Sequence, residues 1–277
     1  MGAALGRRLA SDGWDIAASA RTPQDAARLT AQAVQPVDLA DPKALGDTLA
    51  TTNAILITAP PTPEGCPGLT ALVPALARGR AFPDWIGYLS TTGVYGDRRG
   101  GWAFEQSPLA AQSLEGARRA GAERDWLQFA RGMGLTVAVF RLPGIYGPGR
   151  SALDRLRAGR ARRVAAPGQV FSRIHLDDLT SGLAASMAKP RPGGIYNLCD
   201  DEPAPNPDVI AYAADLLGMA PPPEIPLAEA GLSPAGQRFY AESKRVSNAR
   251  AKAELGWRPL YPTYREGLGA ILEKENP

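Results

Sequence analysis

Short apolar runs alternate along the chain with segments in which leucine and alanine recur at helical spacing. The runs expected to form strands are residues 14–20, 34–37, 54–58, 85–89 and 136–140. This alternation predicts an α/β fold built on a mostly parallel, doubly wound, Rossmann-like sheet. In such a sheet ligands bind at the carboxyl ends of the strands, so functional side chains are expected there.

Two helix starts carry clear capping signals. Thr22 is followed by Pro23 and Asp25, which are typical of an N-cap, a first-turn proline and an acidic third position. Asp41 with Pro42 repeats this arrangement before the next helix. Helices are therefore expected to begin directly after Thr22 and Asp41.

The first predicted helix, residues 3–10, has no predicted strand before it. A helix in a parallel sheet crosses over between two strands, so one is expected on each side. The absence of a strand before this helix would leave two neighbouring strands of the sheet with unpaired edges. We therefore expect that the true start lies upstream of Met1, while a short variant that fills the gap otherwise stays open.

After residue 145 the pattern changes to shorter elements rich in proline, glycine and arginine. Residues 1–145 are expected to form the Rossmann-like domain, and residues 146–277 a small C-terminal capping region from which elements at about 170–200 return to the sheet. Within the second region the sequence predicts helices at 206–219, 249–255 and 264–272, and a proline-rich connector at 220–226.

Composition narrows the function classes. The 277 residues are 44% hydrophobic, which suits a globular core, and neither a membrane-spanning run nor a hydrophobic signal segment is seen, so a cytoplasmic protein without a membrane partner is expected. Two cysteines and one histidine argue against a metal site. Thirty-one basic against 28 acidic residues are too balanced to indicate nucleic-acid binding.

Five motifs stand in order at or after the predicted strand ends. Residues 88–97 read YLSTTGVYGD, 140–150 FRLPGIYGPGR, 173–178 RIHLDD, 195–200 IYNLCD and 255–257 LGW. Together they resemble the extended short-chain dehydrogenase/reductase superfamily, in particular its NAD-dependent epimerase/dehydratase group. The resemblance covers nearly the whole chain and implies a nicotinamide cofactor and a small-molecule substrate.

The resemblance also implies which residues hold the cofactor. Family members open with a strand and a G-x-G-x-x-G turn, of which only Gly2 can be matched here, as its last glycine. Arg21 stands where an arginine accommodates a 2′-phosphate, which favours NADP while NAD stays open. The remaining cofactor candidates are Asp38, Leu39, Ala59, Pro60, Thr91, Leu142, Pro143 and Gly144. A solvated arginine at 21, a helix cap at 38 and a plain loop at 59–60 are the alternatives.

Catalysis departs from the family pattern. The family site combines Ser or Thr with a Tyr and a Lys four residues apart on a helix, and Thr91 fits the first place. No Y-x-x-x-K follows, and alignment puts Glu115 at the Tyr position and Arg119 at the Lys position. Arg118 and Arg119 would lower the pKa of Glu115, so a surface ion pair is the competing interpretation.

Other side chains could supply protons or bind substrate. Tyr95 and Tyr146 are candidates that could equally pack their loops, and His175 is a candidate base whose family counterpart is structural. Substrate phosphate could be bound by Arg150, Arg173 and Arg245, with the run Arg155, Arg157, Arg160, Arg162 and Arg163, which could equally be a solvated basic surface.

Two functions follow from these observations. The first is an NAD(P)-dependent oxidoreductase or epimerase of the atypical branch, acting on a nucleotide-sugar-like or other carbonyl or hydroxyl substrate. The second is a non-catalytic NADP-binding module. Family members commonly pair through helices that flank the sheet, so a homodimer stays open.

Overall fold

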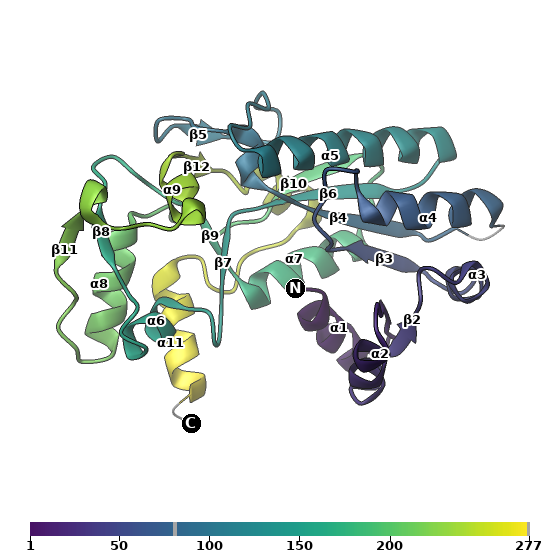
Figure 1. Cartoon of the computed structure of the whole chain (residues 1–277), viewed down its shortest axis with the longest axis horizontal. Helices are drawn as coiled ribbons and strands as arrows, with labels where there is room; N and C mark the ends of the chain where they lie inside the picture. Colours follow the sequence, from purple (N-terminus) through teal and green to yellow (C-terminus); the bar gives the residue numbers. More distant parts are fainter. Residues whose placement is uncertain (80–81, 276–277) are drawn as a thin grey trace. The chain divides into compact units, whose positions relative to one another are not determined.

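The computed structural model of the chain describes residues 1–79 and 82–275, in which helices and strands alternate (Figure 1). The strands are β1 (Ala17–Ser19), β2 (Gln35–Val37), β3 (Ala54–Ile57), β4 (Trp85–Thr91), β5 (Trp102–Ala103), β6 (Val137–Leu142), β7 (Gly144–Tyr146), β8 (Arg163–Ala165), β9 (Arg173–His175), β10 (Gly194–Asn197), β11 (Glu224–Pro226) and β12 (Arg245–Val246).

The helices are α1 (Gly2–Ser11), α2 (Pro23–Thr30), α3 (Pro42–Leu49), α4 (Pro67–Arg78), α5 (Leu114–Met133), α6 (Ala152–Arg157), α7 (Leu176–Ala188), α8 (Asn206–Leu216), α9 (Pro234–Tyr240), α10 (Ala249–Leu255) and α11 (Tyr264–Glu275). Two short 3-10 helices, η1 (Thr92–Tyr95) and η2 (Leu227–Glu229), complete the set.

Two compact units share the chain. The first comprises Met1–Ser90, Arg118–Val139 and Ser186–Ile195, and the second Thr91–Ala117, Phe140–Ala185 and Tyr196–Pro277. The units interleave along the sequence, and the predicted boundary at residue 145 stays a prediction.

The predicted α/β architecture is confirmed, and its largest sheet has the strand order β10-β6-β4-β3. Strands β3 and β4 pair in parallel, and β1 and β2 form a separate parallel pair. Within the described residues β1 pairs only with β2, and β3 only with β4. Each therefore has one edge without a strand neighbour in this part of the chain.

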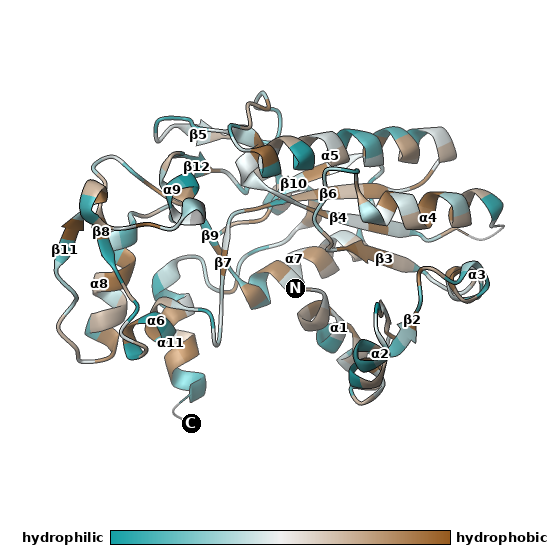
Figure 2. Cartoon of the chain, viewed as in Figure 1, coloured by the Kyte–Doolittle hydropathy of each residue, from teal (hydrophilic) through white to brown (hydrophobic). Residues whose placement is uncertain are grey.

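The core of the first unit lies between its strands and helices. Trp126 from α5 and Leu76 from α4 share one buried cluster with Ile86 and Tyr88 from β4. Figure 2 colours β3 as apolar along its length, whereas α5 alternates between apolar and polar residues. The strand is therefore suited to burial on both faces and the helix on one.

Both predicted helix caps are present. Thr22 Oγ1 accepts a hydrogen bond from the backbone N–H of Asp25 at 3.1 Å. Asp41 Oδ1 accepts from the backbone N–H groups of Lys43 and Ala44 at 2.9 and 3.1 Å. These bonds satisfy donors at the helix start that have no intrahelical partner.

The second unit is held by three short parallel pairs, β7–β9, β8–β11 and β5–β12. Helices α6, α8 and α11 pack around Leu153, Ile210 and Leu268 in a second buried cluster. The interpretation of residues 220–226 as a plain connector is wrong in part, because β11 lies within it and pairs with β8.

We expect Gly68→Ala to destabilise the first unit. A Cβ at this position in α4 would lie 2.8 Å from Ile57 Cγ2 and 3.3 Å from Trp126 Cζ2, and overpacking of this kind costs roughly 1–3 kcal/mol. Gly46→Ala is the matched control, because a Cβ on this exposed part of α3 meets no described atom within 4 Å and should stabilise by up to about 1 kcal/mol. Urea denaturation measures both, and equal effects of the two substitutions would contradict the packing described.

Candidate active site

Thr91 ends strand β4 and begins the turn that follows it. Its Oγ1 accepts a hydrogen bond from the backbone N–H of Gly93 at 3.1 Å, which makes Thr91 the N-cap of η1. After η1, Gly96 has a φ of +66°, and a Cβ there would lie 2.0 Å from the backbone oxygen of Ala110. Among the described residues the Thr91 hydroxyl donates no hydrogen bond, so its hydrogen can serve a bound molecule.

Tyr95 is enclosed in the protein rather than presented to a ligand. Its hydroxyl donates to Asn197 Oδ1 at 2.7 Å and accepts from a terminal nitrogen of Arg141 at 3.0 Å. The ring is fully buried, and this burial raises the pKa of Tyr95 to about 12, although Arg141 opposes the shift. The geometry therefore favours the packing interpretation of Tyr95 over proton transfer.

The Tyr95 contacts extend to a loop residue that the sequence did not single out. Arg141 also donates to the backbone oxygen of Glu105 at 2.9 Å, and Glu105 Oε1 accepts from the backbone N–H of Asn197 at 2.9 Å. Burial raises the pKa of the Glu105 carboxyl. Arg141 and Asn197 stand inside two of the motifs, whereas nothing local in the sequence marks Glu105.

Glu115 and Arg119, aligned with the family tyrosine and lysine, have different environments. Glu115 is exposed in the first turn of α5, and its Oε1 lies 3.6 Å from a terminal nitrogen of Arg238. The surface ion pair weighed for Glu115 is therefore found with Arg238, and not with Arg118 or Arg119. Arg119 is half-buried, donates to the backbone oxygen of Leu89, and lies 6.0 Å from the ring centroid of Tyr88.

The cofactor candidates of the first unit lie at strand and helix ends. Gly2 opens α1, and a Cβ there would lie 3.5 Å from Thr58 Cγ2, directly after β3. Ala59 and Pro60 follow Thr58 and are exposed. In the described residues α1 starts without a side-chain cap, and a helix start of this kind suits an anion.

Arg21, Asp38 and Leu39 follow β1 and β2. Arg21 is exposed, and no hydrogen bond or ion pair of its side chain is found among the described residues. Asp38 Oδ1 accepts from the backbone N–H of Ala40 at 2.8 Å, which closes a turn; the helix cap weighed for Asp38 is not found, because the N-cap of α3 is Asp41. Leu39 has 39% of its surface exposed. Arg21 and Leu39 are therefore exposed beyond the first two strands, and their role in holding a cofactor stays a prediction.

The remaining cofactor candidates belong to the second unit. Leu142 ends β6 and is buried, Pro143 is half-buried, and Gly144 begins β7 and is exposed. Gly144 pairs with Arg173 in the register of β7 and β9. This short connection therefore offers exposed backbone directly after a buried strand.

Most of the substrate candidates are engaged inside the second unit. Tyr146 is buried, and its hydroxyl lies so close to Gly267 that a Cβ there would be 2.0 Å away. Arg173 donates to the backbone oxygens of Phe171 and Ala204 at 2.8 and 2.9 Å, and burial lowers the pKa of its guanidinium. Arg245 donates to the backbone oxygen of Gly100.

Arg150 differs from these residues because it is exposed. It lines a hollow of about 260 Å³, here called the Arg150 hollow, which is formed by Gly149, Arg150, Ser151, Asp154, Arg155 and Arg160. Tyr146, Arg173 and Arg245 therefore do not line this hollow.

His175 is buried at the end of β9. Its Nδ1 accepts from the backbone N–H of Asp177 at 3.1 Å, and its ring lies edge-on between the rings of Tyr146 and Tyr261, with centroids 5.3 and 4.5 Å away. Burial lowers the pKa of the imidazole, which favours the neutral form. These contacts agree with the structural role weighed for His175.

The described residues hold no group of three or more His, Cys, Asp or Glu side chains placed to bind a metal ion. No helix among them is long and apolar enough to cross a membrane.

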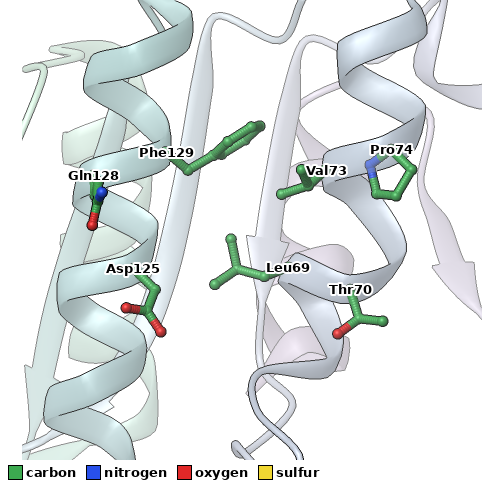
Figure 3. Close-up of a pocket in the computed structure, with 7 residues that line it drawn as sticks. All are labelled: Leu69, Thr70, Val73, Pro74, Asp125, Gln128 and Phe129. Atoms are coloured by element: carbon green, nitrogen blue, oxygen red, sulfur yellow. The ribbon is translucent and has the colours of Figure 1, made fainter.

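A larger groove lies away from these candidates. The α4–α5 groove has a volume of about 550 Å³ and is lined by Leu69, Thr70, Val73, Pro74, Asp125, Gln128 and Phe129. In Figure 3, Leu69 and Val73 on α4 and Phe129 on α5 point into the space between the two helices. Its lining is mostly apolar, and Asp125 is its only ionisable residue, so it suits a packing contact better than chemistry.

No family model matches the chain. A conserved protein of unknown function from Silicibacter pomeroyi DSS has a solved structure that is 43% identical, with a TM-score of 0.89, over 100% of this chain and 96% of that one. Protein YeeZ of Escherichia coli K12 is 28% identical over 95% of this chain and 93% of its own length. A 3-diazoavenalumate denitrifying reductase from Streptomyces is 32% identical over 49% of this chain, and the match spans about half of that reductase, 47%.

Solved structures with known ligands share the fold. A double mutant of the dTDP-glucose 4,6-dehydratase DesIV from Streptomyces venezuelae, with NAD and DAU bound, is 20% identical with a TM-score of 0.77, over 99% of this chain and 93% of that one. RMD from Pseudomonas aeruginosa, complexed with NADPH, is 20% identical with a TM-score of 0.67, over 89% and 92%. A candidate NAD-dependent epimerase/dehydratase from Methylobacillus flagellatus is 25% identical with a TM-score of 0.70, over 99% and 95%.

We expect Tyr95→Phe to lower the free energy of unfolding by roughly 1–3 kcal/mol, because it removes the donor to the buried Oδ1 of Asn197 and one of the acceptors of Arg141. Tyr146→Phe is the matched control. The Tyr146 hydroxyl is buried and has no hydrogen-bond partner in the described residues, so its removal should be neutral or stabilising. Urea denaturation of the two variants measures the difference, and equal losses would contradict the environments described.

Proposed function

We propose that this chain, which belongs to the extended short-chain dehydrogenase/reductase family, is an NAD(P)-dependent oxidoreductase or epimerase of the atypical branch. The observation that carries the proposal is the turn after β4, where Thr91 is held as an N-cap with its hydroxyl hydrogen unused among the described residues. Its substrate would carry a carbonyl or hydroxyl oxygen, as a nucleotide sugar does.

In this proposal the Thr91 hydroxyl donates a hydrogen bond to the substrate oxygen and orients it. The chain of contacts from Tyr95 to Arg141 and Asn197 supports the turn that carries Thr91. Arg119 retains a positive charge where the family has a lysine. The nicotinamide, when bound, supplies the hydride-transfer chemistry, and the protein supplies binding and orientation.

Gly2 at the start of α1, Arg21 after β1, and Ala59 and Pro60 after β3 would take the adenosine and phosphate part of the cofactor. Leu142, Pro143 and Gly144, which the family resemblance assigns to the nicotinamide, are the candidates of the second unit. The exposed guanidinium of Arg21 supports NADP over NAD, because it can pair with a 2′-phosphate.

A non-catalytic NADP-binding module is the second candidate. It is favoured by the missing tyrosine and lysine pair, since Glu115 lies in an exposed ion pair and the Tyr95 hydroxyl is taken up by Asn197 and Arg141. Binding without turnover would need only the cofactor residues.

We also infer a homodimer in which two copies meet at the α4–α5 groove. The apolar side chains that point into the groove in Figure 3 would be covered by the equivalent helices of a second copy. Members of the family commonly dimerise through helices that flank the sheet, which supports a second copy of the chain as the partner at this groove.

The function is tested by incubating the purified chain with NADPH or NADH and a panel of nucleotide sugars and aldehydes. An oxidoreductase consumes the reduced cofactor. An epimerase converts the nucleotide sugar without a net change in the cofactor, so the sugar products are analysed as well, and a binding module binds NADPH and does neither. For a substrate that is turned over, we expect Thr91→Ala to lower kcat/KM by about 100-fold, as the loss of one donor to the reacting oxygen does elsewhere.

Thr91→Ser is the matched control, because it keeps both the hydroxyl and the cap on η1. It should retain most of the activity, and both variants should bind NADPH as the wild type does. If neither nicotinamide cofactor bound the wild-type chain, the enzyme and the module would both be refuted.

The homodimer is tested by sedimentation velocity. We expect Val73→Glu to give a monomer at concentrations where the wild type is a dimer, because it places a charge in the α4–α5 groove. Leu260→Glu is the control, since this side chain is 70% exposed and lies outside the groove. A wild-type monomer at micromolar concentration would contradict the inference.

A further inference from the structure

The basic run between residues 150 and 163 separates into paired and unpaired guanidinium groups. Arg157 donates to Glu275 Oε2 at 2.5 Å, and Arg162 donates to the backbone oxygen of Ala230. Arg163 donates to the backbone oxygen of Pro222 at 3.3 Å and lies 3.6 Å from Glu224. These three arginines therefore hold the second unit together.

Arg150, Arg155 and Arg160 are used differently. All three are exposed and line the Arg150 hollow, and within residues 1–79 and 82–275 their guanidinium groups make no hydrogen bond or ion pair. They lie in one continuous stretch, residues 150–160, in the loop before α6, in α6 itself and in the turn after it, so proximity in the sequence brings them together. Like charges at this spacing repel one another, and a bound anion would offset that repulsion.

The single carboxylate of the hollow does not neutralise these charges. Asp154 Oδ2 accepts from the backbone N–H of Ser151 at 2.7 Å and from its hydroxyl at 2.6 Å, which closes a capping box at the start of α6. One carboxylate, engaged with Ser151, thus faces three guanidinium groups. The hollow carries an excess of positive charge.

The size and chemistry of the hollow specify a ligand. Guanidinium groups match phosphate oxygens with two parallel hydrogen bonds, which makes phosphate a preferred partner of arginine. A volume of about 260 Å³ lies below the range of roughly 300–1,000 Å³ that is typical of sites for whole drug-sized molecules. The space suits a phosphate or diphosphate group better than a complete nucleotide.

We propose that Arg150, Arg155 and Arg160 form a binding site for the phosphate or diphosphate group of a small molecule. The site goes beyond the proposed reaction and does not depend on it, because phosphate binding needs neither cofactor nor turnover. The phosphate could belong to the substrate or to a separate effector, and both sources share this chemistry.

Isothermal titration of the whole chain with inorganic pyrophosphate at low ionic strength tests the site. We expect one site, with affinity lowered at least tenfold by the triple variant Arg150→Ala, Arg155→Ala, Arg160→Ala, since each charge-assisted hydrogen bond is lost. Arg155→Lys should bind with intermediate affinity, because an ammonium keeps the charge and loses the two-bond geometry. Thermal unfolding of each variant checks that the fold is retained.

The matched control is the triple variant Arg28→Ala, Arg78→Ala, Arg131→Ala, which removes the same charge from exposed positions elsewhere. It should bind pyrophosphate within about twofold of the wild type, as salt screening limits the reach of distant surface charges. The proposal is overturned if the wild type does not bind pyrophosphate, if the Arg150 triple variant binds as the wild type does, or if the control loses as much affinity.

Two further titrations identify the source of the phosphate. Adenosine diphosphate should bind the hollow about as tightly as pyrophosphate if only the phosphate groups are held, and this binding should also be lost in the triple variant. Titration of pyrophosphate into the assay with NADPH should raise the KM of a phosphorylated substrate if the hollow holds the phosphate of that substrate, and should leave this KM unchanged if the ligand is a separate effector. Failure of these titrations leaves the proposed oxidoreductase function untouched, and absence of NADPH binding leaves the phosphate site untouched.

Discussion

The N–H groups of a buried guanidinium need hydrogen-bond acceptors, and in the second unit this requirement comes from Arg141. It is 3% exposed, and removing its charge from water costs several kcal/mol unless hydrogen bonds and a favourable environment compensate. One terminal nitrogen bonds both Tyr95 and the backbone of Glu105, while the guanidinium centre lies 4.9 Å from the Tyr95 ring centroid. The turn that carries Thr91 is placed by these same contacts, so the candidate site depends on a group that need not touch a ligand.

Elements with a local signal were predicted from the sequence, and elements that depend on a distant partner were not. The caps at Thr22 and Asp41 are complete within a few residues, and the apolar runs are long enough to be read as strands. Strand β5 has two residues and exists because β12, far along the chain, pairs with it. A segment of two residues is too short for its sequence pattern to predict pairing with a distant strand.

The sequence offers candidate side chains for the site but does not show what each of them contacts. Tyr95 was a candidate proton donor, yet its motif contains no sign that Arg141 and Asn197 occupy both sides of its hydroxyl. Glu115 was paired with neighbouring arginines by helical spacing, whereas its partner comes from α9. The alternatives of solvation and phosphate binding for the basic run could not be separated without the partners of each guanidinium group. Side-chain partnership is a tertiary property, and only local spacing is visible in a sequence.

The replacement of the family tyrosine and lysine limits the chemistry that the residues present can perform. Glu115 is exposed and lies beside the guanidinium group of Arg238, so it does not reproduce the tyrosine and lysine pair of the family. Thr91 can polarise an oxygen by donating a hydrogen bond, but a hydroxyl of this kind does not release its proton at neutral pH. Protons would then be exchanged with water or within the substrate. Hydride transfer to or from a carbonyl or hydroxyl carbon tolerates this arrangement better than a reaction that also removes a proton from carbon, because that step needs a positioned base.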